Sequence, residues 1–460
     1  MADKRDLKIK KHKHMTEDNE PSPLAWELSS KKRARVKKKD RPKPVTEPPA
    51  AAADETTSAE QPAEPRRKKR RSAGLRLGLR LLAVFAVLAL VLTVWRNWDT
   101  LAPRNLLFWM DQAFSAKGDG YPVEVSGSSV LDMQEEQSYL VMLTDTSLVA
   151  LNAKGGEVMR RQHNYSDPIL LTNGKYMLIA EVGGKRFRLE TMPDTVLDVT
   201  TNNLAEDKKT SVLDTPVENA IISAAVRADG TVALVTESSQ SYTSEALVYS
   251  SSGKLLYRQK FATMMATDVA LSPNEKEIAV AGIEAADGAM RSRVQVHTLR
   301  SKDTTPRKEY VGDGVLLARV SYLSGGEIAA IGDTQTWIVD PDSDQDKRIS
   351  YDQQQLVGRA IGSKTVDLAL QKYGSGDGGE VMRLDAKGET VYTAAFSGSF
   401  RHMCVSDSRL LLLTAGRLYH GDGEKMNGGQ DVQQDGRMVG ILGDKAIVLG
   451  LTSLSEYTVE

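Results

Sequence analysis

The sequence predicts an all-β domain, a seven- or eight-bladed β-propeller, that follows a single transmembrane helix and a disordered basic N-terminal tail. Three observations predict this organisation. Short apolar runs separated by turn residues recur about 34 to 56 residues apart from residue 123 to the end of the chain. One uncharged apolar stretch covers residues 81–94. The first 74 residues are rich in charge and proline and contain a single aromatic side chain, Trp26.

Residues 1–74 are expected to form a disordered basic cytoplasmic tail. Residues 31–39 read KKRARVKKK, and residues 41–65 consist mainly of proline, alanine, glutamate and small polar residues. Such a segment has too little apolar surface to fold. The tail serves as a solvated linker, or its basic clusters bind the anionic membrane surface. Nucleic acid is not expected as a partner, because no aromatic residues are interspersed among the basic ones.

The membrane anchor is expected at residues 75–98. The uncharged stretch from Leu81 to Val94 spans about 21 Å as a helix, which is less than the roughly 30 Å of a hydrocarbon core. Its flanks supply the remaining length, because two basic and two aromatic side chains suit the two membrane interfaces. A buried core helix and a cleaved signal peptide are the alternatives, and the eighty preceding residues argue against the second. The four flanking residues are Arg76, Arg80, Trp95 and Trp98.

The charge distribution predicts the orientation of this anchor. Residues 1–80 contain 23 lysines and arginines against 12 acidic residues, and the remaining residues contain 37 against 49. Six consecutive basic residues, Arg66 to Arg71, precede the anchor, so the positive-inside rule places the N-terminus in the cytoplasm. The expected localisation is the cell membrane, with the C-terminal domain outside the cytoplasm.

Residues 99–120 are expected to form a juxtamembrane amphipathic helix and a linker. Pro103 suits a helix start, and apolar side chains crowd the segment from Leu106 to Phe114. This helix lies in the outer membrane–water interface or packs beneath the domain that follows. The glycines between Ala116 and Pro122 end it.

The propeller is assigned to residues 121–460. Each repeat starts with an apolar run, expected to be the innermost strand, and continues through a hairpin and a turn to an outer strand. The eighth repeat is too short for four strands, so ring closure requires an N-terminal strand such as Tyr121 to Gly127. A pair of β-sandwiches or an irregular solenoid is the alternative. The repeats begin at Ser138, Gly174, Gly230, Glu275, Gly326, Lys364, Ser408 and Asp444.

Residues 118–130, 143–158 and 163–190 carry a resemblance to a known family. Placed after a basic tail and a single anchor, they resemble an uncharacterised family of single-pass membrane proteins from Gram-positive gut bacteria with a predicted quinoprotein-like β-propeller ectodomain. The resemblance implies the fold but no activity, cofactor or site. The blades are more distantly similar to quinoprotein-type propellers, including outer-membrane assembly lipoproteins that act as scaffolds.

A run of four alternating aspartates is the only candidate for a metal site, and it is a weak one. With Asp340 as the first ligand of a calcium loop, Gln345 stands at the sixth position, where glycine is needed. Tyr351 stands at the twelfth position, where a bidentate glutamate is needed. A polar inter-strand loop is therefore expected, and neither a metal nor a cofactor is predicted. The four weak candidates are Asp340, Asp342, Asp344 and Asp346.

The most distinctive polar cluster of the domain is HNYSDP, which starts at His163. It forms either a blade corner, with the histidine packed between sheets, or a ligand-facing loop that presents His163, Tyr165 and Asp167. Cys404 is the only cysteine, which excludes an intrachain disulfide.

No pattern of catalytic residues stands out in the propeller segment. There is no G-x-S-x-G elbow and no H-E-x-x-H motif. The sequence favours a non-catalytic binding or scaffold module of the cell envelope, with an unknown envelope protein or glycan bound at a propeller face and membrane lipid bound by the anchor. The alternative is a propeller enzyme that acts on envelope glycans through acidic residues in the central channel.

Overall fold

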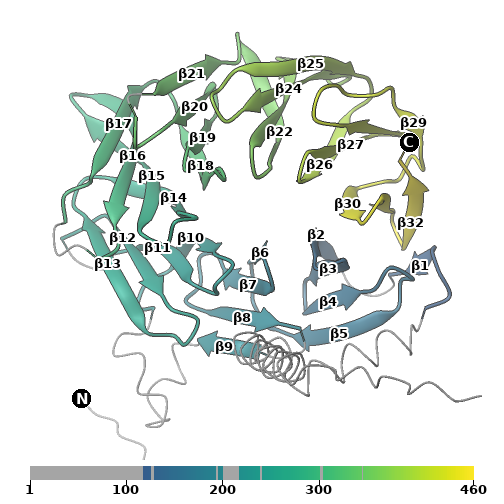
Figure 1. Cartoon of the computed structure of the whole chain (residues 1–460), viewed down its shortest axis with the longest axis horizontal. Helices are drawn as coiled ribbons and strands as arrows, with labels where there is room; N and C mark the ends of the chain where they lie inside the picture. Colours follow the sequence, from purple (N-terminus) through teal and green to yellow (C-terminus); the bar gives the residue numbers. More distant parts are fainter. Residues whose placement is uncertain are drawn as a thin grey trace, which may run out of the picture. The chain divides into compact units, whose positions relative to one another are not determined.

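The computed structural model describes residues 118–125, 129–192, 195–199, 217–238, 241–300, 304–343 and 345–459. Within these residues every helix or strand element is a strand, and the 32 strands form eight four-stranded antiparallel sheets. The sheets are arranged as blades around a common centre (Figure 1). The prediction of an all-β propeller is confirmed, and the blade number is eight.

Blades 1 to 4 consist of consecutive strands that run from the innermost to the outermost. Blade 1 contains β2 (Val130–Glu136), β3 (Tyr139–Thr144), β4 (Ser147–Leu151) and β5 (Glu157–Gln162). Blade 2 contains β6 (Pro168–Asn173), β7 (Tyr176–Glu181), β8 (Phe187–Thr191) and β9 (Thr195–Val199). Blade 3 contains β10 (Ile221–Val226), β11 (Val232–Glu237), β12 (Ser244–Tyr249) and β13 (Leu255–Phe261). Blade 4 contains β14 (Met265–Leu271), β15 (Glu277–Ala286), β16 (Ala289–Thr298) and β17 (Lys308–Asp313).

Blades 5 to 7 follow the same order, and blade 8 takes its outermost strand from the N-terminal side of the domain. Blade 5 contains β18 (Leu317–Tyr322), β19 (Ile328–Gly332), β20 (Gln335–Val339) and β21 (Asp346–Ser350). Blade 6 contains β22 (Gln354–Ile361), β23 (Thr365–Lys372), β24 (Gly379–Asp385) and β25 (Thr390–Phe396). Blade 7 contains β26 (Phe400–Ser406), β27 (Arg409–Thr414), β28 (Arg417–Gly421) and β29 (Gln430–Asp431). Blade 8 contains β30 (Met438–Leu442), β31 (Lys445–Leu449), β32 (Ser453–Thr458) and β1 (Val123–Glu124).

Ring closure uses the predicted N-terminal strand. In β1, Val123 pairs with Leu454 and Glu124 pairs with Ser453 on β32. The amide of Val125 extends the ladder by donating to the carbonyl oxygen of Thr452 at 2.7 Å. The two ends of the propeller therefore share one sheet, and β1 pairs with the outer edge of β32.

The predicted repeats match the eight blades one to one, but their phase is wrong by one strand. Each predicted repeat begins just before the second strand of a blade; Ser138, for example, precedes β3. The reason is that second strands lie between neighbouring sheets and are almost wholly apolar, whereas innermost strands alternate buried and partly exposed residues. All six residues of β3 are buried, against three of the seven residues of β2.

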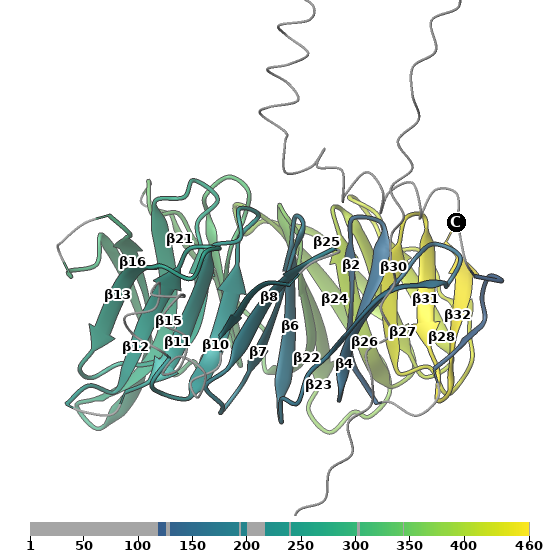
Figure 2. The same ribbon diagram turned by 90° about the horizontal axis from the view of Figure 1, so that it is seen from below.

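Each blade packs on the next through an apolar cluster that both blades contribute to, and the eight seams hold eight such clusters. At the seam of blades 7 and 8, Leu411 and Leu413 of β27 pack with Val439 and Ile441 of β30. All innermost strands run in the same direction along the channel. The propeller therefore has two distinct faces, one where these strands begin and one where they end (Figure 2). We call the face where the innermost strands begin the start face, and the opposite one the end face.

A bulge recurs near the beginning of six of the eight innermost strands. In each of these strands the register against the second strand shifts by one residue, which leaves one residue unpaired. Bulges increase local twist and change the direction of the side chains that follow. The residues directly after the bulges are Asp132, Ser223, Asp268, Arg319, Gly358 and His402.

The predicted tail, anchor and juxtamembrane helix, residues 1–117, lie outside the described residues. They include the four residues predicted to flank the anchor, Arg76, Arg80, Trp95 and Trp98. Among the residues from 118 onward that the structure describes, no helix is long and apolar enough to cross a membrane.

Candidate functional site in the central channel

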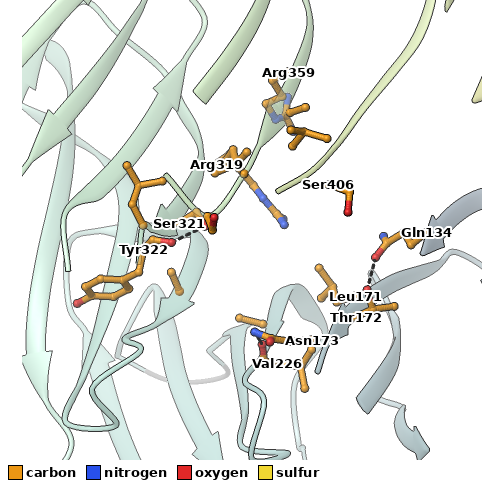
Figure 3. A pocket seen from close by; sticks show the side chains of 18 of the residues that line it. Gln134, Leu171, Thr172, Asn173, Val226, Arg319, Ser321, Tyr322, Arg359 and Ser406 are labelled. Carbon is orange, nitrogen blue, oxygen red and sulfur yellow. Dashed lines mark hydrogen bonds between the residues drawn. The ribbon is translucent and has the colours of Figure 1, made fainter. Parts of the chain in front are cut away.

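The innermost strands enclose a central channel. Its main part has a volume of about 1130 Å³ and is lined by residues from the innermost strands of blades 1 to 7 and the turns that follow them. A smaller adjoining cavity of about 280 Å³ adds residues of β30 in blade 8. Figure 3 shows polar side chains from several blades around this space.

The blade 1 side of the channel is a closed network of hydrogen bonds. The Nε2 atom of Gln134 donates to Asp132 Oδ2 at 2.8 Å and to the Leu170 carbonyl oxygen of blade 2 at 3.0 Å. Thr172 Oγ1 donates to Gln134 Oε1 at 3.0 Å, and the Met133 amide donates to Asp132 Oδ1 at 2.7 Å. Both oxygens of Asp132 are therefore engaged by its own strand.

Glu135 joins three blades across the same side of the channel. Its Oε1 atom accepts from the Gly443 amide of blade 8 at 3.1 Å, and its Oε2 atom accepts from Ser406 Oγ of blade 7 at 3.2 Å. The Glu135 carboxylate thus connects blade 1 to blades 7 and 8.

The neighbouring carboxyl group of Glu136 is buried, and burial raises its pKa to about 7. The negative charge of Glu135 raises it further. A carboxyl group with this pKa exchanges its proton near neutral pH.

Across the channel, Asp268 on β14 is fully buried and holds blades 3, 4 and 5 together. Its Oδ1 atom accepts a short hydrogen bond from Ser223 Oγ of blade 3, and its Oδ2 atom accepts from the Val320 amide of blade 5 at 2.7 Å. Burial raises the pKa of Asp268, and the positive charge of Arg319 opposes that shift. The Nε atom of Arg319 lies 3.7 Å from Asp268 Oδ2.

Two arginines line the channel from neighbouring blades, Arg319 on β18 and Arg359 on β22. Figure 3 shows the guanidinium group of Arg319 extending into the open space. The pKa of Arg359 is lowered, first by burial and then by the positive charge of Arg319. The two arginines lie on neighbouring blades and line the same cavity.

His402 on β26 completes the lining on the blade 7 side. Its Nδ1 atom lies 3.1 Å from the carbonyl oxygen of Val439 in blade 8. Burial lowers the pKa of His402, and the charge of Asp132 opposes the shift. The histidine is neutral near pH 7 and links two blades.

The predicted ligand-facing loop at His163 lies between β5 and β6, away from the channel lining. His163 and Tyr165 are buried, and His163 Nε2 lies 3.0 Å from the carbonyl oxygen of Thr144. Asp167 is exposed, and its carbonyl oxygen accepts from the Val182 amide. Arg186 packs over the Tyr165 ring at 4.9 Å. The structure thus brings His163 and Tyr165 together in a corner, with only the Asp167 side chain directed to solvent.

The aspartate run occupies the turn between β20 and β21. Asp340 Oδ1 accepts from the Asp342 amide at 2.9 Å, Asp342 pairs with Arg307 at 2.8 Å, and Asp346 pairs with Arg348 at 2.9 Å. Asp344 lies outside the described residues. Among the residues that the structure describes, no group of three or more His, Cys, Asp or Glu side chains is arranged to hold a metal ion.

Sequence reasoning missed the channel residues Arg319, Arg359, Asp132 and His402. They lie on innermost strands, which were assigned to the connections between repeats. The only signal in the sequence is a polar residue inside an otherwise apolar run, as in LARVSY from Leu317. Such residues are common on any half-exposed strand, so the pattern does not identify a site.

A family model described as a family of unknown function, DUF5711, matches residues 119–428. The chain belongs to this family. The matched segment runs from just before β1 to the loop after β28. The DUF5711 match therefore includes most of the channel lining and ends before β29 of blade 7 and the strands β30 to β32 of blade 8. No curated protein matches the sequence.

Solved structures of propellers resemble this DUF5711 chain in fold. The C-terminal WD40 domain of Sif2 matches with a TM-score of 0.52 and 13% identity, over 74% of this chain and 99% of that one. Sqt1 from Saccharomyces cerevisiae matches with a TM-score of 0.51 and 9% identity, over 74% of this chain and 98% of that one. BamB from Moraxella catarrhalis matches with a TM-score of 0.44 and 9% identity, over 74% of this chain and all of that one. At these identities the first two support the fold alone.

Proposed function

We propose that the protein is a membrane-anchored, extracytoplasmic binding or scaffold module of the cell envelope, and that a protein partner covers the start face of its propeller. The proposed anchor is supported by the uncharged stretch from Leu81 to Val94 and by the basic and aromatic residues that flank it. The source that the resemblance implies is a Gram-positive gut bacterium. Lipid contacts belong to the anchor and to the basic tail.

The observation that carries the proposal is the position of the exposed apolar side chains. Among the described residues, ten large apolar side chains are exposed, and seven of them lie at the start face, in loops between second and third strands or at the beginnings of innermost strands. The other three, Leu256, Val311 and Val391, lie on outermost strands. The seven are Leu131, Tyr242, Met265, Met290, Leu316, Tyr373 and Leu451.

An apolar side chain in water costs free energy that a partner recovers when it covers the surface. Aromatic residues and methionine are enriched at protein–protein interfaces, and the start face exposes two tyrosines and two methionines. A protein partner therefore fits this face.

Site-specific photo-crosslinking in intact cells tests the proposal. A photoreactive residue replaces Tyr373 or Leu451 at the start face, which are 66% and 64% exposed, or Leu256 or Val391 on outermost strands, which are 46% and 40% exposed. The start-face positions should give the same discrete adduct, and the outermost-strand positions should not. Met265→Asp should abolish the adduct from Tyr373. Equal adducts from all four positions, or none from the start face, would refute a start-face partner.

A cysteine accessibility experiment tests the anchor and its orientation separately. In a Cys404→Ser background, a cysteine at Ser343 should react with an impermeant thiol reagent on intact cells, and a cysteine at Ser58 should react only after lysis. The reverse pattern would overturn the proposed topology without bearing on the start face.

Catalysis in the channel is the second candidate, because the raised pKa of Glu136 suits a general acid or base. The nearby carboxylates of Asp132 and Glu135 are occupied by structural hydrogen bonds, which favours the binding role. If the channel cleaves glycans, the full-length chain should release new reducing ends from envelope glycan, and Glu136→Gln should stop the release. Equal release by both proteins would end the catalytic interpretation of Glu136.

A further inference from the structure

The central channel carries charged side chains of both signs on different blades. The acidic residues Glu135 and Glu136 lie on blade 1, whereas Arg319 and Arg359 lie on blades 5 and 6 across the same cavity. Figure 3 shows Arg319 and Arg359 on one side of the space and Gln134 on the other.

The carboxylate closest to the arginines is already occupied. Asp268 accepts from Ser223 Oγ through one oxygen and from the Val320 amide through the other, and only Arg319 Nε approaches it, at 3.7 Å. No hydrogen bond joins the terminal Nη atoms of Arg319 to another described residue. Arg319 is thus held in place by Asp268 while most of its donors face the cavity.

The positive charge of Arg359 is compensated less than that of Arg319. Among the residues that the structure describes, it forms neither a hydrogen bond nor an ion pair, although it lines both the main and the adjoining cavity. On the opposite side, the oxygens of Asp132 and Glu135 are engaged by neighbouring groups of the protein. Neither guanidinium group is hydrogen-bonded to a carboxylate of the described residues, and the two like charges on neighbouring blades of one cavity repel each other.

We propose that the central channel binds a small oxyanion, a phosphate or carboxylate group, between Arg319 and Arg359. A guanidinium group offers paired N–H donors whose spacing matches the oxygens of either group, so two arginines can hold one anion from both sides. An anion there removes the repulsion between the arginines and supplies the hydrogen bonds that the protein lacks. The cavity of about 1130 Å³ has room for a small molecule that carries the group. The site lies inside the ring and is independent of the partner proposed for the start face.

Thermal unfolding of the full-length chain in mild detergent tests the site, with inorganic phosphate and succinate as separate probes. Each is compared with sodium chloride at equal ionic strength, because specific binding to the folded state raises the midpoint beyond the general salt effect. The variants are Arg319→Gln and Arg359→Gln. Arg417→Gln is the matched control, since Arg417 lies on β28, is 46% exposed and pairs with Asp431 outside the channel.

At least one probe should raise the midpoint of the wild-type and Arg417→Gln proteins by several degrees in a saturable manner. Both channel variants should lose at least three quarters of this shift. Without any probe, Arg359→Gln should unfold at a temperature equal to or above the wild type, because the substitution removes an uncompensated charge; a residue that only supports the fold would give a lower midpoint.

The response of the two probes identifies the group, because a phosphate site and a carboxylate site rank them oppositely. The proposal is overturned if neither probe exceeds the chloride control, or if Arg359→Gln keeps the wild-type shift. Either result leaves the crosslinking test of the start face unaffected.

Discussion

The second strand and the innermost strand of one blade lie side by side, yet they differ sharply in burial. In blade 7 five of the six residues of β27 are buried, against one of the seven residues of β26. Both faces of a second strand are covered by neighbouring blades, and both of its edges are paired. An innermost strand is paired along one edge only, and its other edge borders the channel. Second strands therefore stabilise the ring, whereas innermost strands are free to carry polar groups for binding.

The largest effect is expected where a second strand carries a buried charge. Asp367 on β23 pairs with Arg383 on β24 at 2.7 Å, and both side chains are fully buried. Arg383 also donates to the carbonyl oxygens of Ser408 and Asp422 in blade 7. Asp367→Ala leaves a buried guanidinium without its carboxylate, so the free energy of unfolding should fall by about 3–5 kcal/mol. Denaturant unfolding followed by circular dichroism measures the loss.

The control for this prediction is Asp431→Ala, which removes an exposed partner of Arg417 that is 92% exposed. An exposed pair contributes little, so its loss should change the free energy of unfolding by less than about 1 kcal/mol. Similar losses for the two variants would contradict the distinction between second strands and the periphery.

Truncation of apolar side chains compares the two strands directly. Leu412 on β27 is completely buried, and Leu412→Ala should lower the free energy of unfolding by about 2–5 kcal/mol. Val405 on the neighbouring β26 is only partly buried, so Val405→Ala should cost about 1 kcal/mol. The same denaturation experiment applies, and a larger loss for Val405→Ala would reverse the assignment of stability to second strands.

A buried histidine in a sheet should make the fold sensitive to acid. His297 on the third strand β16 is buried against Tyr257 and Phe261, and burial lowers its pKa to about 4. Below an ordinary histidine pKa of about 6.5 the unfolded chain binds a proton that the folded chain does not, so stability falls as the pH drops from about 6.5 to 4. The full loss is at most about 3 kcal/mol. His297→Gln should make stability less dependent on pH between about pH 6.5 and 4. An unchanged pH dependence in the variant would contradict the lowered pKa of His297.

Glu136 on the innermost strand β2 should have the opposite and smaller effect. Its pKa is raised to about 7, so between about pH 4.5 and 7 the folded chain holds a proton that the unfolded chain has released. Stability therefore falls as the pH rises through this range, by less than about 3 kcal/mol because the channel admits water. Glu136→Gln should remove this decline and raise the unfolding midpoint at pH 8. An unchanged decline in the variant would show that Glu136 does not hold its proton in the folded protein over this pH range.

Hydrophobic periodicity was sufficient to predict an all-β propeller of seven or eight blades. Eight apolar runs mark eight second strands, because a strand enclosed between sheets must be apolar on both faces. The need for an N-terminal strand followed from counting, since the repeat that begins at Asp444 is too short for four strands, and β1 supplies the outermost strand of blade 8. The innermost strands were missed because one free edge lets them alternate polar and apolar residues as a connecting segment does.

The channel was beyond sequence reasoning for a physical reason. Arg319 and Arg359 are 40 positions apart, and the packing of blade 5 on blade 6 places them on one cavity. Asp132 and His402 are 270 positions apart, and only closure of the ring places them on one cavity. The bulges that direct several of these side chains depend on pairing with the second strand and leave no pattern in the residues themselves. The sequence by itself determined the all-β class, the eight repeats and the strand that closes them, since these depend on local apolar patterning. The tertiary structure alone decided which charges face one another, because that depends on contacts between residues distant in the chain.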